Sequence, residues 1–329
     1  MKAALSMRTT VFFLSAIIIT SILAILSLTT GPFKGVHIGD VIEYIIYGTG
    51  DNAGIVRYRL FRTIAAMTVG VGLAVSGLSM QYSLRNPLAD PFLLGVSSGA
   101  ALGVVMVLVY VNRPHPVLIY TVAMMLGLVS FFIVIGIGAK SGGSPSSIIV
   151  AGVSVSYALS GITIFIINKY LYKINITFMW LFGTVAYVTK KTLSITLLLV
   201  SIGTIFLLIL SDKIYTLVLG DEVSQSMGVN VKHVRYTTLL MSALTASATV
   251  ALAGPVGFIG LAAPWLSRLL VGSKFNVTLA MSILMGSALA LTSDIMIRLV
   301  SPSQEVPLTA FTALFGGPLL FYLTKKTGW

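Results

Sequence analysis

Long stretches without a single charged residue constrain this chain more than any other feature. Because a helix needs about 20 apolar residues to cross a hydrocarbon core of about 30 Å, each stretch can span a bilayer. Their apolar residues do not alternate with polar ones as in a membrane β-barrel strand. The chain is therefore predicted to be an all-α polytopic membrane protein. Eight of the stretches are residues 10–30, 63–84, 92–112, 116–139, 141–168, 192–211, 275–293 and 306–324.

A ninth charge-free stretch, residues 236–267, is too long for one span. Its 32 residues would form a helix about 48 Å long at about 1.5 Å per residue. Gly254-Pro255 lies inside it, and proline removes a helical hydrogen bond and breaks or kinks the helix. We therefore expect two spans, 235–253 and 257–272, which bring the prediction to ten transmembrane helices.

Residues 174–189 form a shorter apolar run, which we expect to lie at the outer surface without crossing. Ten spans place both termini on one side, and basic residues flank both ends of the chain. The positive-inside rule then predicts a multi-pass cell-membrane protein with cytoplasmic termini, although its basic residues divide almost evenly, eleven inside and ten outside. Residues 10–30 are read as a retained span because the run is long for a signal peptide. Residues 1–329 form a single transmembrane domain.

Charge and composition exclude several function classes. Only 9% of the residues are charged and 57% are apolar, which excludes a water-soluble fold. The net charge of +12 sits mainly in the short connections between spans, as expected beside lipid head groups, so no nucleic-acid partner is expected. The chain has no cysteine, which excludes disulfides and thiolate metal sites.

The sequence contains no catalytic constellation. Its three histidines lie in separate connections, and no phosphate-binding loop of the G-x-x-x-x-G-K-[ST] type is present. The chain is therefore not expected to be an enzyme or to carry a metal or a cofactor. Gly70, Gly72, Ala74, Ser76 and Gly77 form a small-residue surface in the second span, which favours close helix packing, with the lining of a translocation route as the alternative.

One connection is long enough to receive a partner on the inner side, residues 212–234. Asp221 and Glu222 follow Gly220 and favour the start of a short helix, since acids stabilise a helix N-terminus. Gly228 favours its end. We expect two short helices joined by a glycine turn, forming a cytoplasmic coupling loop.

Charge inside the spans is sparse. Asp294 and Arg298 are four residues apart and can pair on one helix face. A proton- or sodium-coupled transporter usually needs acids deep in its spans, and the first seven spans have none in their apolar interiors. An ion-coupled secondary transporter therefore remains an alternative to an ATP-driven importer, and a structural membrane anchor is a third.

Three motifs carry a family resemblance, and they occur in order at residues 85–103, 220–229 and 254–270. They read RNPLADPFLLGVSSGAALG, GDEVSQSMGV and GPVGFIGLAAPWLSRLL. The chain resembles the FecCD-type permease subunits of ATP-binding cassette (ABC) importers for iron–siderophores, haem and cobalamin. The resemblance implies a type II importer permease with ten spans. It also implies a homodimer, two cytoplasmic ATPase subunits and an external substrate-binding protein.

The resemblance also assigns gate and coupling residues. It places an inner gate at Asn86 and Leu88, between the second and third spans. A second gate element falls between the fourth and fifth spans, where the family often has hydroxyl residues. It comprises Ser144, Pro145 and Ser146, and the coupling motif comprises Gly220, Asp221, Glu222 and Gly228.

The resemblance further implies a docking surface for the binding protein. Relatives read R-L-P-R before the second span, and this chain reads Arg59-Leu60-Phe61-Arg62. In a cobalamin relative, these arginines and one after the ninth span face acidic residues of the binding protein, and Arg298 matches the latter. Contact with lipid head groups is the alternative for the three arginines. Three residues depart from the family pattern. Phe61 stands where relatives have proline, Pro145 where they often have a hydroxyl residue, and Trp265 where they commonly have histidine.

Overall fold

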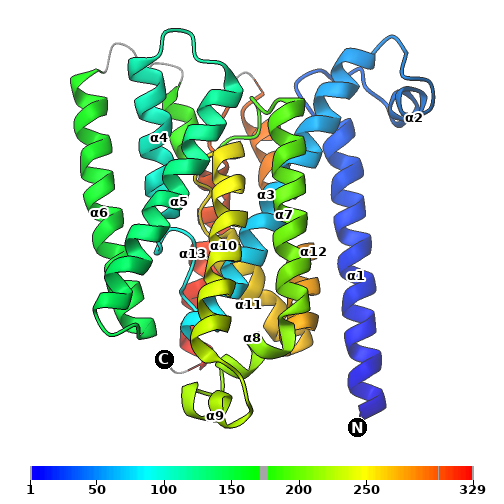
Figure 1. Cartoon of the computed structure of the whole chain (residues 1–329). Helices are drawn as coiled ribbons and strands as arrows, with labels where there is room; N and C mark the ends of the chain where they lie inside the picture. Colours follow the sequence, from blue (N-terminus) through cyan, green and yellow to red (C-terminus); the bar gives the residue numbers. More distant parts are fainter. Residues whose placement is uncertain (1, 171–176, 303, 328–329) are drawn as a thin grey trace.

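The computed structural model describes residues 2–170, 177–302 and 304–327, and every regular element in these ranges is helical (Figure 1). The prediction of an all-α fold is confirmed. The elements are α1 (Lys2–Thr29), α2 (Ile38–Tyr47), α3 (Ala53–Leu84), α4 (Val96–Tyr110), α5 (Pro116–Lys140), α6 (Pro145–Lys169), the 3₁₀-helix η2 (Thr177–Phe182), α7 (Lys190–Ile209), α8 (Ser211–Leu217), α9 (Asp221–Ser226), α10 (Val231–Ala253), α11 (Ile259–Val271), α12 (Phe275–Val300) and α13 (Leu308–Thr327).

Helix α3 forms the centre of the bundle and packs against α10, α11 and α12. The small residues predicted to allow close packing do so. A side chain at Gly70 would collide with the backbone of Gly286, and one at Gly77 would collide with the backbone of Gly260. Glycine therefore allows two neighbouring helices to approach α3 at backbone contact.

Seven of the described helices are long and apolar enough to cross a membrane. Helices α4 and α11 are apolar but shorter, and α13 coincides with the last expected span. The predicted division of residues 236–267 is right, because α10 ends at Ala253 and α11 begins at Ile259. Gly254 between them has a φ of 77°, which favours glycine. The total of ten spans stays a prediction.

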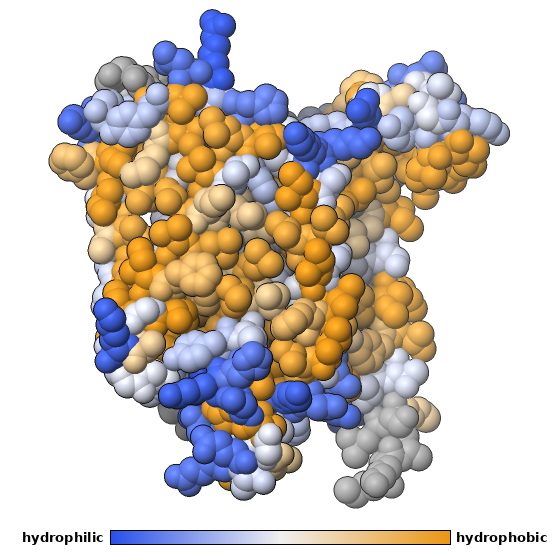
Figure 2. Space-filling model, in the orientation of Figure 1, coloured by the Kyte–Doolittle hydropathy of each residue, from blue (hydrophilic) through white to orange (hydrophobic). Residues whose placement is uncertain are grey.

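The bundle has two distinct ends, and an apolar belt lies between its more hydrophilic ends (Figure 2). Helix α9 marks one end, where α1 begins and α13 ends (Figure 1). Helix α2 lies at the opposite end. Within the part of residues 174–189 that is described, η2 is the only helix, and it contacts α4 and α13.

Candidate functional site

The first part of the site is the short helix α9, flanked by two glycines with positive φ. Gly220 has a φ of 105° and Gly228 a φ of 79°, so both turns use backbone conformations that other residues rarely adopt. Ser224 stabilises the segment from inside, since its hydroxyl donates to the carbonyl oxygen of Thr216 at 2.7 Å. The start of α9 at Asp221 and its end before Gly228 match the sequence prediction. The second short helix is α8, which precedes α9, whereas the turn at Gly228 leads into the long helix α10. Glu222 is exposed beside Asp221.

Asp221 connects α9 to the bundle through two arginines. Its carboxylate accepts hydrogen bonds from Nη2 of Arg235 at 2.6 Å and from Nη1 at 3.1 Å. Nη2 of Arg85 lies 3.2 Å from the same carboxylate. Arg235 is buried, and its Nε donates to the carbonyl oxygen of Ser83 at 3.1 Å. The last turn of α3, the start of α10 and α9 therefore share one charged network.

Asp221 is ionised near neutral pH. Hydrogen bonds from Arg235 lower the pKa of Asp221 below its ordinary value, and the charges of Arg235 and Arg85 act in the same direction against partial burial. A lowered pKa means that the carboxylate is ionised throughout the neutral range. The ion pairs are lost only as the pH falls through that lowered pKa.

The first predicted gate element begins next to Arg85, which joins this network. Arg85 ends α3 with a φ of 47°, a left-handed conformation that turns the chain sharply. Asn86 follows, and its side-chain oxygen accepts from the backbone N–H of Leu88 at 2.9 Å. This turn leaves the Leu88 side chain 52% exposed. The predicted gate residues Asn86 and Leu88 thus lie on a tight turn attached directly to the α9 network.

The second predicted gate element lies at the start of α6. Ser144 caps the helix, and its hydroxyl accepts from the backbone N–H of Ser147 at 3.1 Å. Pro145 occupies the first helical position, where the missing N–H costs no hydrogen bond. Ser146 is exposed beside it. Proline at this position of the chain is therefore compatible with a regular helix start.

The two predicted gate elements belong to one packed unit. The chain between α3 and α4 packs on α6, since Ser156 donates to the carbonyl oxygen of Phe92 at 3.1 Å. A side chain at Gly152 would collide with the carbonyl oxygen of Leu93. Ala89 also shares an apolar cluster with Ile148. The two chain segments that carry the predicted gate elements therefore pack against each other.

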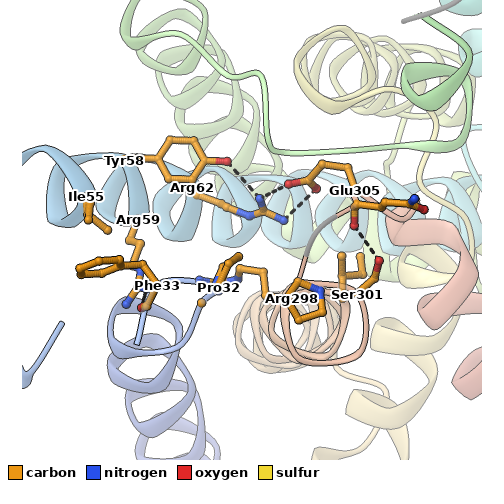
Figure 3. Close-up of a pocket in the computed structure, with 13 residues that line it drawn as sticks. Pro32, Phe33, Ile55, Tyr58, Arg59, Arg62, Arg298, Ser301 and Glu305 are labelled. Atoms are coloured by element: carbon orange, nitrogen blue, oxygen red, sulfur yellow. Dashed lines mark hydrogen bonds and ion pairs between the residues drawn. The ribbon is translucent and has the colours of Figure 1, made fainter. Parts of the chain in front are cut away.

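The second part of the site lies at the opposite end of the bundle, around Arg62 (Figure 3). Nε of Arg62 lies 2.8 Å from Oδ1 of Asp294, which is completely buried. Nη1 and Nη2 of Arg62 donate to the carboxylate of Glu305 at 2.6 and 3.1 Å. Tyr58 contributes its hydroxyl oxygen at 3.1 Å from Nη1.

Arg298 pairs with the other carboxylate oxygen of Asp294. Its Nη2 lies 2.8 Å from Oδ2 of Asp294, an ion pair whose angle falls outside hydrogen-bond geometry. The predicted pairing of these two residues is right. Nη1 and Nη2 of Arg298 also donate to the backbone and the hydroxyl of Ser27 at 2.7 and 2.6 Å, which ties α12 to α1.

Arg59 is the third of the arginines predicted to face outward. Its guanidinium donates to the carbonyl oxygens of Thr29 at 2.7 Å and Phe33 at 2.6 Å. Arg59, Arg62 and Arg298 are all buried, and they line a cavity of about 260 Å³ that Glu305 also borders. These three side chains therefore do not form an exposed basic surface, because acceptors within the protein bind each guanidinium.

Two features of this end are absent from the sequence predictions. Glu305 is the acid that meets Arg62, but 243 residues separate them in the chain, so no local spacing predicts the pair. Helix α2 does have a local signal, since apolar residues recur at helical spacing between residues 38 and 46.

Phe61 and Trp265, which depart from the family pattern, are both half-buried.

Across the three described ranges of the chain, no group of three or more metal-ligating side chains comes together. The buried acid Asp294 faces two arginines, which is the arrangement of a structural ion-pair cluster. The buried charges of Arg62, Asp294 and Arg298 at one end, and of Arg235 at the other, are thus paired within the protein.

The comparisons with known proteins decide the family. Residues 19–326 match the FecCD transport family, which is nearly the whole chain. The chain belongs to the FecCD transport family. It is therefore the membrane permease of an ABC importer, in which ATP hydrolysis lies on a separate subunit. This confirms the resemblance found in the sequence, and neither the family nor the relatives favour an ion-coupled secondary transporter.

Relatives and solved structures agree with this membership. The chain is 33% identical over 317 residues to "Probable heme-iron transport system permease protein IsdF" of Staphylococcus aureus strain MSSA476, and the match covers 94% of each chain. The protein of the same name in strain Newman is 32% identical over 315 residues.

Among solved structures, an inward-facing conformation of a protein assigned as a metal-chelate type ABC transporter matches with a TM-score of 0.84 at 26% identity, covering 97% of this chain and 99% of that one. PsaBC from Streptococcus pneumoniae, in complex with Fab, matches with a TM-score of 0.57 at 17% identity and shares the fold.

Proposed function

We propose that this permease imports haem or another iron chelate, delivered by an external binding protein and driven by ATP hydrolysis on two cytoplasmic ATPase subunits. The haem-iron permeases among its relatives support this substrate class, and cobalamin is the alternative substrate within the family. The observation that carries the mechanism is the network of Asp221, Arg235 and Arg85, which joins α9 to the first gate element.

The end of the bundle that carries α9 is proposed to face the cytoplasm, with both termini. Helices α8 and α9 would receive the ATPase there, because they form a short helical pair outside the spans with Glu222 exposed on it. The two glycine turns would let α9 move as a rigid lever. The link to Arg85 would carry that movement to Asn86 and Leu88.

The gate is proposed to close between two copies of the chain. Leu88 and Ser146 are both exposed in the single chain, so a second copy can meet them without repacking the bundle. Paired across a twofold axis, four short elements would narrow the route at the cytoplasmic end. The homodimer is part of the proposal.

Docking of the binding protein is proposed at the cavity around Arg62. Because this arginine is buried and already bonded, an incoming acidic side chain has to replace Glu305 rather than meet a free cation. Glu305 is partly exposed at 28%, whereas Asp294 is completely buried, so Glu305 is the partner that can be exchanged. Docking would then loosen the connection between α3 and the segment that precedes α13.

The proposed substrate is tested by ATP hydrolysis in proteoliposomes that contain the permease, its ATPase and its binding protein. The binding protein is loaded in turn with haem, an iron–siderophore or cobalamin. We expect haem or the iron chelate to stimulate hydrolysis above the level of the empty binding protein. Stimulation by cobalamin alone would contradict the proposed substrate, and stimulation by none of the three would contradict the proposed class.

A further inference from the structure

Helix α2 has an apolar face that no other element of the described chain covers. Ile38, Ile42, Ile45 and Ile46 recur at the spacing of one helix face, whereas Asp40 and Glu43 lie on the other side. All four isoleucines are exposed, with Ile45 at 63% and Ile46 at 64%. A free apolar face on a helix this short marks an interaction surface.

The helix is held in a defined orientation at one edge of this face. Val41 is buried and packs with Val36 and Val56 in a small cluster that joins α2 to the start of α3. The first turn is fixed by the backbone N–H of His37, which donates to Asp40 at 2.6 Å. The glycine after the last turn, Gly48, has a φ of 71° and ends the helix. The isoleucine face is therefore presented by a fixed element.

The position of α2 indicates what covers this face. Figure 2 shows apolar surface on the underside of the projection that α2 forms, and this side faces toward the level of the apolar belt of the spans. The exposed Ile25 and Leu26 of α1 end that belt about one turn before Thr29. The isoleucine face thus continues the lipid-facing surface of α1 at the level where the hydrocarbon core ends.

We propose that α2 is a membrane-surface helix whose four isoleucines insert into the leaflet at the end of the bundle opposite α9. Its occupant is lipid, because the face continues a lipid-facing surface and carries no charge. An amphipathic helix of this kind lies in the interface plane with its apolar side about 5–10 Å into the boundary of the head groups and acyl chains. Since α2 joins α1 to α3, its insertion into lipid would fix the position of the start of α3, which carries Arg59 and Arg62.

Site-directed spin labels test this directly, because the chain has no natural cysteine. The label is placed at Ile42, Ile45 or Ile46 of the full-length permease in lipid nanodiscs, and at Glu43 on the opposite face as the matched control. Collision rates are measured with oxygen, which concentrates in the bilayer, and with a nickel chelate, which stays in water. We expect the ratio of oxygen to nickel collisions to be higher at every isoleucine than at Glu43.

The same measurements distinguish lipid from a protein partner. Equal nickel access at the isoleucines and at Glu43 in nanodiscs would overturn the proposal. Shielding of the isoleucines that develops only after the binding protein is added, or dipolar coupling between Ile46 labels on two copies of the chain, would assign the face to a protein and also overturn it. These results do not depend on the substrate, so they stand apart from a failure of the proposed transport function.

Discussion

Both carboxylate oxygens of Asp221 accept hydrogen bonds from the guanidinium of Arg235, at 2.6 and 3.1 Å. Such two-point pairs fix orientation as well as distance. Because Arg235 also donates to Ser83 at the end of α3, the short helix α9 cannot turn freely against the bundle. A force applied to α9 therefore reaches the last turn of α3, where the first gate element begins.

Removing the charge of Asp221 should uncouple the ATPase from transport. In Asp221→Asn the two arginines lose their shared anion, and the buried Arg235 is left without a charged partner. We expect ATP hydrolysis by the assembled importer to continue while substrate uptake per ATP falls several-fold. Uptake and hydrolysis are measured on the same proteoliposomes.

Asp212→Asn is the matched control for this variant. It removes one acid from α8, close to the same segment, at an exposed side chain outside the Asp221 network. We expect its ratio of uptake to hydrolysis to equal that of the wild type. The same loss of coupling in both variants would mean that the charge of the segment matters and the specific link does not.

Arg62, at the opposite end of the bundle, should stabilise the folded permease. Arg62→Met leaves the fully buried Asp294 with one cation in place of two and leaves Glu305 unpaired. Removing one partner of a buried ion pair typically costs about 3–5 kcal/mol. We expect a clear drop in the thermal unfolding temperature of the purified permease. The exposed Arg57→Met, one turn earlier in α3, should unfold as the wild type does, and an equal drop in both would argue against the cluster.

Neutralising Glu305 should strengthen docking of the binding protein. If an incoming acid replaces Glu305 on Arg62, then Glu305→Gln removes the competitor. An exposed or half-exposed pair contributes roughly 0.2–1 kcal/mol, so the affinity should rise by up to about fivefold. Affinity is measured by surface plasmon resonance on permease nanodiscs at low and moderate salt.

The control for Glu305→Gln is Asp51→Asn, which removes an exposed acid from the connection between α2 and α3. A purely long-range charge effect would raise the affinity in both variants alike. We expect the gain in Glu305→Gln alone. Unchanged affinity in Glu305→Gln would place docking away from the Arg62 cavity.

Cysteines at the gate should crosslink between copies of the chain. Leu88→Cys and Ser146→Cys place thiols on the two gate elements of a chain that has no other cysteine. We expect a disulfide-linked dimer with at least one of them in some nucleotide state, detected by non-reducing electrophoresis. Val129→Cys, an exposed position on α5, should remain monomeric. Absence of crosslinks at both gate positions in all states would place the gate elsewhere.

Local sequence signals predicted much of this molecule. Gly254-Pro255 divides α10 from α11 because glycine and proline end helices, and the i, i+4 spacing pairs Asp294 with Arg298. What the sequence could not show is which way a side chain faces. Topology places Arg62 at the end of the bundle opposite α9, yet its buried charge is compensated by Asp294 and Glu305, which both lie far away in the chain.

The most direct test of the account is uptake of haem into proteoliposomes that contain the permease, its ATPase and its binding protein. The account predicts accumulation that requires hydrolysable ATP and persists when ionophores collapse proton and sodium gradients. Accumulation driven by an imposed ion gradient in vesicles that lack the ATPase would contradict it.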